Sequence, residues 1–224
     1  MNATDPILLV TYLLFIAYFL YRMVQAFNDE YSVRVDQAML KQQLEAHKLQ
    51  DIVNIGFGFA GKYEFNKLKQ FSVSITNKSP NMPIYVDWDY CTMTDFSGRS
   101  RRVTRLVPGR TIDLSQEQVF STIAPNTTLK EFITAEDVLK RGEGAKDKSA
   151  PVALEIEVAQ PLVDPSKVDA KRKTRFMRGK QHLEFFLELA LRHPDSPWDA
   201  ERSRILCKFM LTKLPWTAGL PWAP

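Results

Sequence analysis

The sequence predicts a mainly β protein, an immunoglobulin-like antiparallel β-sandwich carried on an N-terminal transmembrane helix and a helical stalk. Three observations lead there: an uncharged apolar run near the start, a polar stretch without Gly or Pro after it, and then apolar residues that alternate with polar ones. We expect four parts: a transmembrane anchor over 1–28, a helical stalk over 29–53, a β-sandwich over 54–212, and a Pro- and Trp-rich tail over 213–224.

The apolar run is long enough to cross a bilayer. No charge and only one polar residue, Thr11, interrupts Pro6–Tyr21. As a helix, residues 7–27 measure about 31 Å, which matches the hydrocarbon thickness. We expect Arg22 to extend toward the headgroups and Tyr18 and Tyr21 to lie at the interface. The expected membrane-spanning side chains are Ile7, Leu13, Phe15, Tyr18, Tyr21 and Arg22.

Two other interpretations of this run stay open, a buried core helix and a cleaved signal peptide. A signal peptide begins with basic residues and ends at a small-x-small cleavage site, and neither is clear here. The flanking charges predict the direction of the anchor. Arg22 and Arg34 follow the apolar core while no Lys or Arg precedes it, so the positive-inside rule favours a cytoplasmic domain on a single-pass protein of a cell or internal membrane.

Residues 29–53 are rich in Gln, Glu, Lys, Leu and Ala and contain neither Gly nor Pro. Val33, Leu40 and Leu44 fall near helical spacing, which predicts a helix that continues from the membrane. Asp36 and His47 interrupt the apolar heptad positions, so a stalk that packs on its own domain is favoured over a dimeric coiled coil.

Alternation with a period of two predicts the strands of the domain. Turn residues separate these segments, as between antiparallel strands. One short helix is expected over 134–141, with Thr134 as its N-cap. The candidate strands are 71–76, 84–94, 101–106, 118–124, 152–158, 182–191 and 205–211.

Seven short antiparallel strands suggest an immunoglobulin-like sandwich, although Cys91, Trp88 and Cys207 lack the spacing of true immunoglobulin domains. The runs ITNKSPNMPIYVDWDYCTMTDFSGRSRRV and VFSTIAPNTTLKEFITAED resemble a pattern of uncharacterised bacterial surface or membrane-tethered sandwich domains. The resemblance covers about a quarter of the chain. It implies an immunoglobulin-like fold and carries no activity or site residues.

Asp87, Asp89 and Asp95 admit two interpretations. Asp87 and Asp89 would point to one face of a strand, where two carboxylates can share a calcium ion. The favoured interpretation is a ladder of ion pairs across a hairpin closed by Asp95–Gly98, with Asp89 near Arg105 and Asp95 near Arg99. Such cross-strand pairs contribute about 0.2–1 kcal/mol each.

Two segments are candidate contact sites for a partner protein or an anionic lipid surface. Residues 167–180 form a basic segment expected to be a loop before the strand at 182–191. Phe176 is its only aromatic residue, which argues against nucleic acid as a ligand. The tail repeats Leu-Pro-Trp, a motif that presents large rigid side chains. The predicted contact residues are Lys171, Arg172, Lys173, Arg175, Arg178, Trp216 and Trp222.

The sequence contains no recognisable catalytic motif, phosphate-binding loop or metal motif. We therefore expect no cofactor and no enzymatic activity. Whether Cys91 and Cys207 form a disulfide is left open by the sequence. The predicted function is that of a single-pass membrane accessory protein whose β-domain recognises another protein. The alternative is a module that binds anionic lipid through residues 167–180, and a weaker one is a ligand- or calcium-binding sandwich enzyme.

Overall fold

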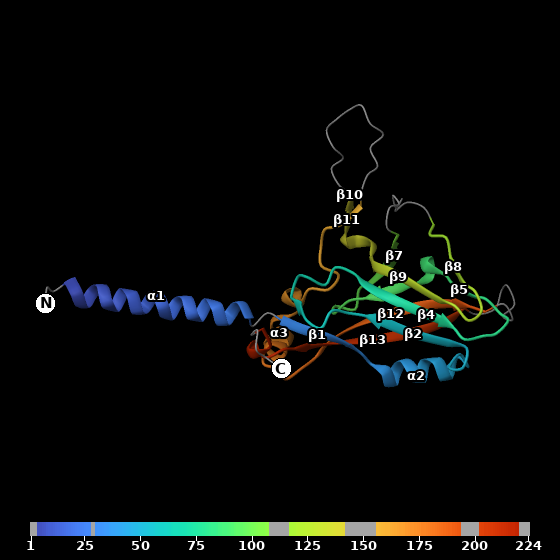
Figure 1. The fold of residues 1–224 in the computed structure, drawn as a ribbon, viewed down its shortest axis with the longest axis horizontal. Helices are drawn as coiled ribbons and strands as arrows, with labels where there is room; N and C mark the ends of the chain where they lie inside the picture. The colour runs from blue at the N-terminus through green and yellow to red at the C-terminus, as the bar shows by residue number, and fades with distance from the viewer. Residues whose placement is uncertain (1–3, 28–29, 108–116, 142–155, 194–201, 220–224) are drawn as a thin grey trace, which may run out of the picture.

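The computed structural model describes residues 4–27, 30–107, 117–141, 156–193 and 202–219, and shows a mainly β domain with one apolar helix projecting from it (Figure 1). Helix α1 (Thr4–Phe27) has 24 residues, about 36 Å of helix. Its window Pro6–Met23 has a mean hydropathy of 1.7 and buries none of its residues in the domain. α1 is thus long and apolar enough to span a membrane, criteria that a signal sequence also meets. The described side chains predicted to span the bilayer are all exposed: Ile7, Leu13, Phe15, Tyr18, Tyr21 and Arg22.

The domain is built on antiparallel strands, and every described strand pairing is antiparallel. The main sheet runs in the order β2-β4-β9-β7-β6-β12-β13-β1-β3, with β5 pairing β12 and β8. Strands β10 and β11 form a separate pair. The strands are β1 (Glu30–Val35), β2 (Val53–Gly58), β3 (Tyr63–Glu64), β4 (Phe71–Asn77), β5 (Ile84–Val86), β6 (Thr92–Thr94), β7 (Ser100–Leu106), β8 (Ser121–Ile123), β9 (Thr128–Ala135), β10 (Leu139–Arg141), β11 (Ile156–Val158), β12 (Leu183–Arg192) and β13 (Ser203–Lys213).

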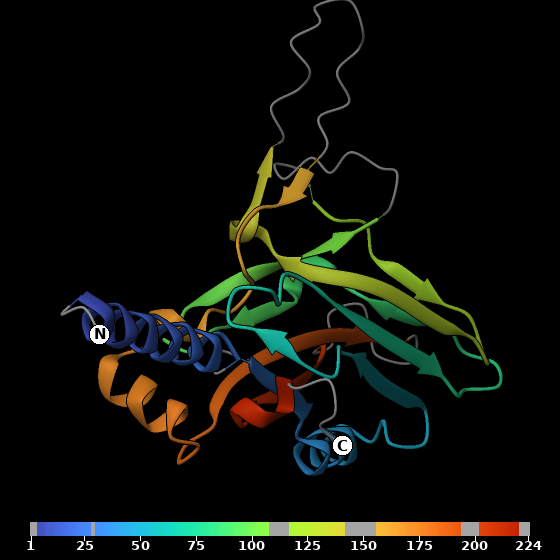
Figure 2. The same cartoon turned by 60° about the vertical axis from the view of Figure 1, so that its left-hand side comes forward.

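The sheet curls so that its two halves face each other (Figures 1 and 2). Strand β7 makes the connection: residues 100–102 pair with β6, and residues 103–106 pair with β9. The strands of β2-β4-β9 therefore lie over β12, β13 and β1. The predicted mainly β fold is confirmed, whereas an immunoglobulin-like sandwich is not, because the hydrogen bonds follow one continuous path.

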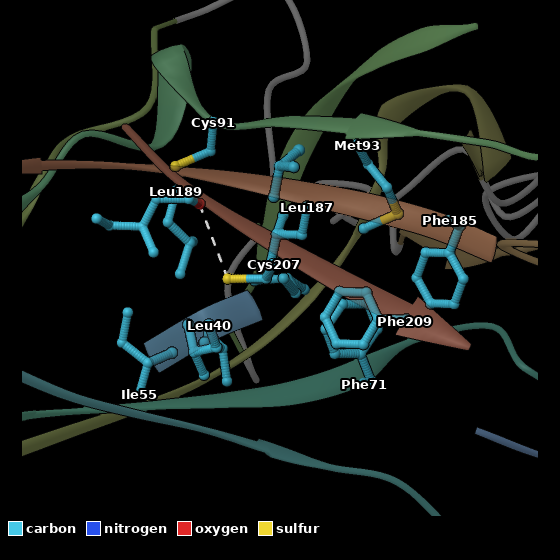
Figure 3. Packing of buried hydrophobic residues seen from close by; sticks show 14 of the residues in the cluster. Leu40, Ile55, Phe71, Cys91, Met93, Phe185, Leu187, Leu189, Cys207 and Phe209 are labelled. Carbon is cyan, nitrogen blue, oxygen red and sulfur yellow. Dashed lines mark hydrogen bonds between the residues drawn. The ribbon is translucent and has the colours of Figure 1, made fainter. Parts of the chain in front are cut away.

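An aromatic cluster joins the two halves. Phe71 of β4 meets Phe209 of β13 with ring centroids 5.4 Å apart, and Phe209 stacks on Phe185 of β12 at 4.7 Å (Figure 3). All three side chains are buried. Alternation along β12 and β13 places every second residue in this core, which is why the period-two pattern located both strands correctly.

The prediction of a continuous helical stalk over 29–53 is wrong. Residues 30–35 form β1, which pairs with β13 and buries Tyr31 and Val33. Aromatic and β-branched residues at this position favour a strand over a helix. Helix α2 (Gln37–Ala46) follows and packs Leu40 and Leu44 into the core. Its N-cap is Asp36, whose carboxylate accepts the backbone N–H of Met39 at 3.1 Å, so this residue begins a helix rather than interrupting one.

Local turns change two other predicted elements. The segment 84–94 is divided by a 3-10 turn, η1 (Trp88–Tyr90), into β5 and β6. The helix expected over 134–141 is a single 3-10 turn, η2 (Glu136–Val138), between β9 and β10, and Thr134 is a strand residue that donates to the Lys69 carbonyl. Of the predicted strand 152–158, only 156–158 lie within the described residues, and they form β11.

Candidate functional site

The predicted basic loop contains a helix, α3 (Ala170–Met177), preceded by a 3-10 turn, η3 (Pro165–Lys167). The carboxylate of Asp169 caps α3 by accepting the backbone N–H of Lys171 at 3.1 Å. The helix ends where Gly179 adopts a φ of +66° and donates its N–H to the Phe176 carbonyl at 2.8 Å. The sequence prediction of a loop is therefore wrong over 170–177, because local capping residues bound a helix on both sides.

One fully buried apolar side chain, with the partly buried Met177 beside it, attaches α3 to the domain. Phe176 is fully buried and its ring centroid lies 6.0 Å from that of Phe65, which in turn lies 6.0 Å from that of Tyr31 in β1. The Arg172 guanidinium adds a hydrogen bond of 2.8 Å to the Phe96 carbonyl. These contacts connect α3 to the strand that follows α1.

Three basic residues form the opposite face of α3. Lys171, Arg175 and Arg178 are spaced i, i+4 and i+7, so they project from one side of the helix axis. All three are exposed, whereas Phe176 lies on the buried side. We call these three residues the α3 basic face. α3 has no acidic residue within Ala170–Met177, and the nearest carboxylate along the chain is that of its N-cap, Asp169.

The structure separates the predicted basic contact residues into two groups. Lys171, Arg175 and Arg178 form the α3 basic face. Arg172 is half-buried against the Phe96 carbonyl, and the Lys173 ammonium lies 3.4 Å from the Ser166 carbonyl. Arg172 and Lys173 thus hold α3 in place. The helical periodicity around Phe176 is what separates these two residues from the three that face solvent.

Helix α3 lies at the end of the domain from which α1 leaves, and both views show this (Figures 1 and 2). The last described turn, η4 (Trp216–Gly219), lies against α1 at the same end. The Lys62 ammonium bridges this region, 3.2 Å from the Glu30 carboxylate and 3.5 Å from the Ala218 carbonyl. The backbone of Trp216 is therefore near α1, while Trp222 lies outside the described residues.

A pocket of about 280 Å³ lies beside α3, between the β6–β7 hairpin and residues 160–169. Its charged groups neutralise one another: Asp137 pairs with Arg99 and lies 3.4 Å from Arg101, which also donates 2.9 Å to the Leu162 carbonyl. Partial burial by itself would raise the pKa of the Asp95 carboxyl. Hydrogen bonds from the Ser97 hydroxyl and from backbone N–H groups outweigh burial and lower that pKa. The pocket wall therefore carries paired rather than excess charge.

The three aspartates are engaged in ion pairs, but one predicted partner is wrong. Asp95 pairs with Arg99 at 3.7 Å as expected. Asp89 pairs with Arg102 rather than Arg105. The reason is that Asp89 lies in the 3-10 turn η1 and not in a strand opposite Arg105. Hydrogen bonding to Asp89 raises the pKa of the Arg102 guanidinium. Among the described residues, no three His, Cys, Asp or Glu side chains lie close enough to hold a metal ion.

Asp87 has a different environment from the other two aspartates. It is buried and lies 3.0 Å from an Arg192 nitrogen and 3.3 Å from an Arg202 nitrogen. Exposed aromatic side chains flank these arginines, at Tyr90 and Phe120. Sequence reasoning did not select these two aromatic residues. Alternation along 118–124 could have drawn attention to Phe120, because Val119 and Phe120 are consecutive apolar residues and cannot both point inward from a strand.

Cys91 and Cys207 are both free and buried in the core (Figure 3). Burial raises the pKa of each thiol to about 12. Cys91 donates to the Asp87 carbonyl at 3.2 Å and accepts the Ala190 N–H at 3.4 Å. Such protonated, solvent-shielded thiols act as packing groups.

Comparison with protein-family models, curated proteins and solved structures found no match to this chain.

Proposed function

We propose that this chain is a single-pass, non-catalytic membrane protein whose β-domain is oriented on an anionic membrane surface by the α3 basic face. The observation that carries the proposal is positional: α3, on which the basic face is exposed, lies at the same end of the domain as α1. If α1 spans the bilayer, that end faces the headgroups.

The expected strength of this contact follows from the number of charges. Each Lys or Arg near an anionic surface contributes about 1 kcal/mol, so three contribute about 3 kcal/mol, or about 150-fold in an equilibrium constant. The anchor already holds the domain at high local concentration near lipid. The α3 basic face would therefore select one orientation of the domain rather than recruit it.

We also propose a cytoplasmic position for the domain. Arg22, near the C-terminal end of α1, and Arg34, after it, lie on the domain side of the apolar core, as the positive-inside rule requires, and the cytoplasmic leaflet is the one rich in anionic lipid. Both arguments favour the same side.

Recognition of a partner protein at the membrane is a second proposed function, for the part of the domain that faces away from the bilayer, where arginines and exposed aromatics gather around Asp87. The curled sheet would provide a rigid scaffold for it, as an immunoglobulin-like sandwich would.

A test of the lipid proposal uses the full chain in liposomes, because α1 is part of the geometry. A cysteine introduced at Thr174, an exposed residue of α3, is labelled with a fluorophore, and quenching by headgroup-labelled lipid is measured. We expect stronger quenching in membranes that contain about a third phosphatidylserine than in pure phosphatidylcholine. High salt should remove the difference, because screening weakens exposed charge contacts.

Charge reversal supplies the matched control. The variant Lys171→Glu, Arg175→Glu, Arg178→Glu should lose the phosphatidylserine-dependent quenching. The variant Lys41→Glu, Lys48→Glu, Lys78→Glu reverses the same number of exposed charges away from α3 and should retain it. Equal quenching in neutral and anionic membranes, or equal loss in both variants, would contradict the proposal.

A further inference from the structure

A second surface gathers exposed aromatic side chains and partly buried arginines at the other end of the domain. In the described chain outside α1, the exposed large apolar side chains are Tyr90, Val119, Phe120 and Phe132. Tyr90 and Phe120 are about half exposed, at 47% and 48%, and Val119 is 71% exposed. Soluble surfaces expose single apolar residues often, so the informative feature is their association with arginines.

Specific contacts join Tyr90 and Phe120 to two arginines, and Val119 is the chain neighbour of Phe120. The Arg202 guanidinium lies 3.4 Å from the centroid of the Tyr90 ring, and that of Arg192 lies 6.0 Å from the centroid of Phe120. Both arginines contact the same Asp87 carboxylate oxygen, at 3.3 and 3.0 Å. We call Tyr90, Val119, Phe120, Arg192 and Arg202 the arginine–aromatic surface.

The backbone beneath this surface is held by the sheet. β5 pairs with both β8 and β12, so residues from three chain segments are kept in one place. The Gln118 N–H donates to the Asp89 carboxylate at 2.9 Å, which ties the segment before β8 to η1. The ring of Tyr85 meets that of Phe120 edge-on at 5.7 Å. A prearranged set of aromatic and arginine side chains loses little entropy on binding, which is typical of residues that dominate protein interfaces.

The charge of the surface indicates the chemical class of its partner. Asp87 is only 6% exposed and lies beneath the two guanidinium groups, whose side chains are about a third exposed. Among the described residues that the ion pairs join here, one buried carboxylate faces two arginines, which leaves a positive charge beside the apolar rings. Carboxylates complement this charge, and an apolar side chain complements the exposed rings.

The position of the surface excludes the bilayer as its ligand when α1 is inserted. Strands β5 and β8 lie at the end of the domain far from α1 (Figure 1). A ligand bound there would come from the aqueous phase or from another protein that extends from the membrane.

We propose that the arginine–aromatic surface binds an acidic segment of a partner protein, with an aromatic or aliphatic side chain placed between its carboxylates. This inference rests on the proposed partner-recognition function and gives it a location and a chemistry. It is independent of lipid binding by the α3 basic face.

The experiment places a photo-crosslinking amino acid at Val119 in the full chain, expressed in its native membranes. The control position is Lys41, an exposed residue of α2. We expect a crosslink from position 119 that is at least tenfold stronger than from position 41. Mass spectrometry of the crosslinked peptide should find at least two Asp or Glu residues within a few positions of an aromatic or aliphatic one. Raising the salt concentration should reduce the yield.

Variants establish which side chains are responsible. Phe120→Ala combined with Arg202→Gln should lower crosslinking at position 119 at least tenfold while the protein keeps its thermal unfolding transition. Lys171→Glu, Arg175→Glu, Arg178→Glu should leave it unchanged, so a failure of lipid docking is distinguishable from a failure of this inference. A crosslink no stronger than that from position 41, or one to lipid, to a basic or neutral segment or to a second copy of the chain, would overturn the proposal.

Discussion

Replacement of Phe176 by Ala tests whether α3 depends on one buried ring. α3 has eight residues, and an isolated helix of this length is marginal in water. Its main apolar attachment is Phe176, which is fully buried against Phe65. Truncating a buried Phe to Ala costs about 3–5 kcal/mol in a packed core. Capping by Asp169 and the hydrogen bond of Arg172 to the Phe96 carbonyl are worth about 1 kcal/mol each, so they cannot replace the ring.

Amide hydrogen exchange measures the expected effect. A loss of 3 kcal/mol in the local opening free energy would accelerate exchange about 150-fold for the amides of α3, while β12 and β13 keep most of their protection. Phe132→Ala is the matched control, because that ring is 43% exposed and its truncation should change stability by about 0.5 kcal/mol or less. Wild-type protection of α3 in the Phe176→Ala protein would refute the reasoning. The same variant should also weaken the anionic-lipid contact of the α3 basic face, since its three charges are no longer held on one side.

Two further predictions concern the core. Phe209→Ala should lower the free energy of unfolding by about 3–5 kcal/mol in denaturant titration, because its ring joins the two halves of the curled sheet; a loss below 1 kcal/mol would mean that the halves do not depend on this contact. Cys91 and Cys207 should resist alkylation at pH 8 in the native protein and react fully after unfolding, because burial raises their pKa from 9.0 to about 12; labelling of the native protein would contradict this. Since the unfolded thiols ionise first, this contribution to stability is present below pH 9 and is lost as the pH rises from 9 toward 12, which pH-dependent denaturation can detect.

Patterns with a short repeat were read correctly from the sequence, whereas the segment after α1 was not. Alternation predicted β4, β12 and β13, because each side of these strands meets a different environment. Residues 30–35 contain both strand formers and polar residues, and their state depends on β13, which lies far along the chain. Only pairing with that partner shows that EYSVRV is a strand.

The candidate site was predicted in composition but not in geometry. The sequence contains the basic residues of 167–180, yet a helix of eight residues bounded by Asp169 and Gly179 decides which of them face solvent. The arginine–aromatic surface has no counterpart in the linear sequence. Arg192 is the last residue of β12 and Arg202 directly precedes β13, while Tyr90 belongs to η1 and Phe120 directly precedes β8.

By itself, the sequence determined the apolar length of α1, the mainly β character of the domain and the excess of basic residues near α3, because these depend on local composition and short-range periodicity. Only the tertiary structure decided that β1 joins the sheet, that the sheet curls into one continuous path, and that α3 lies at the end from which α1 leaves. The reason is physical, because these features arise from contacts between residues far apart in the chain. Examples are the pairing of β13 with β1, the pairing of β7 with β9, and the packing of Phe176 on Phe65.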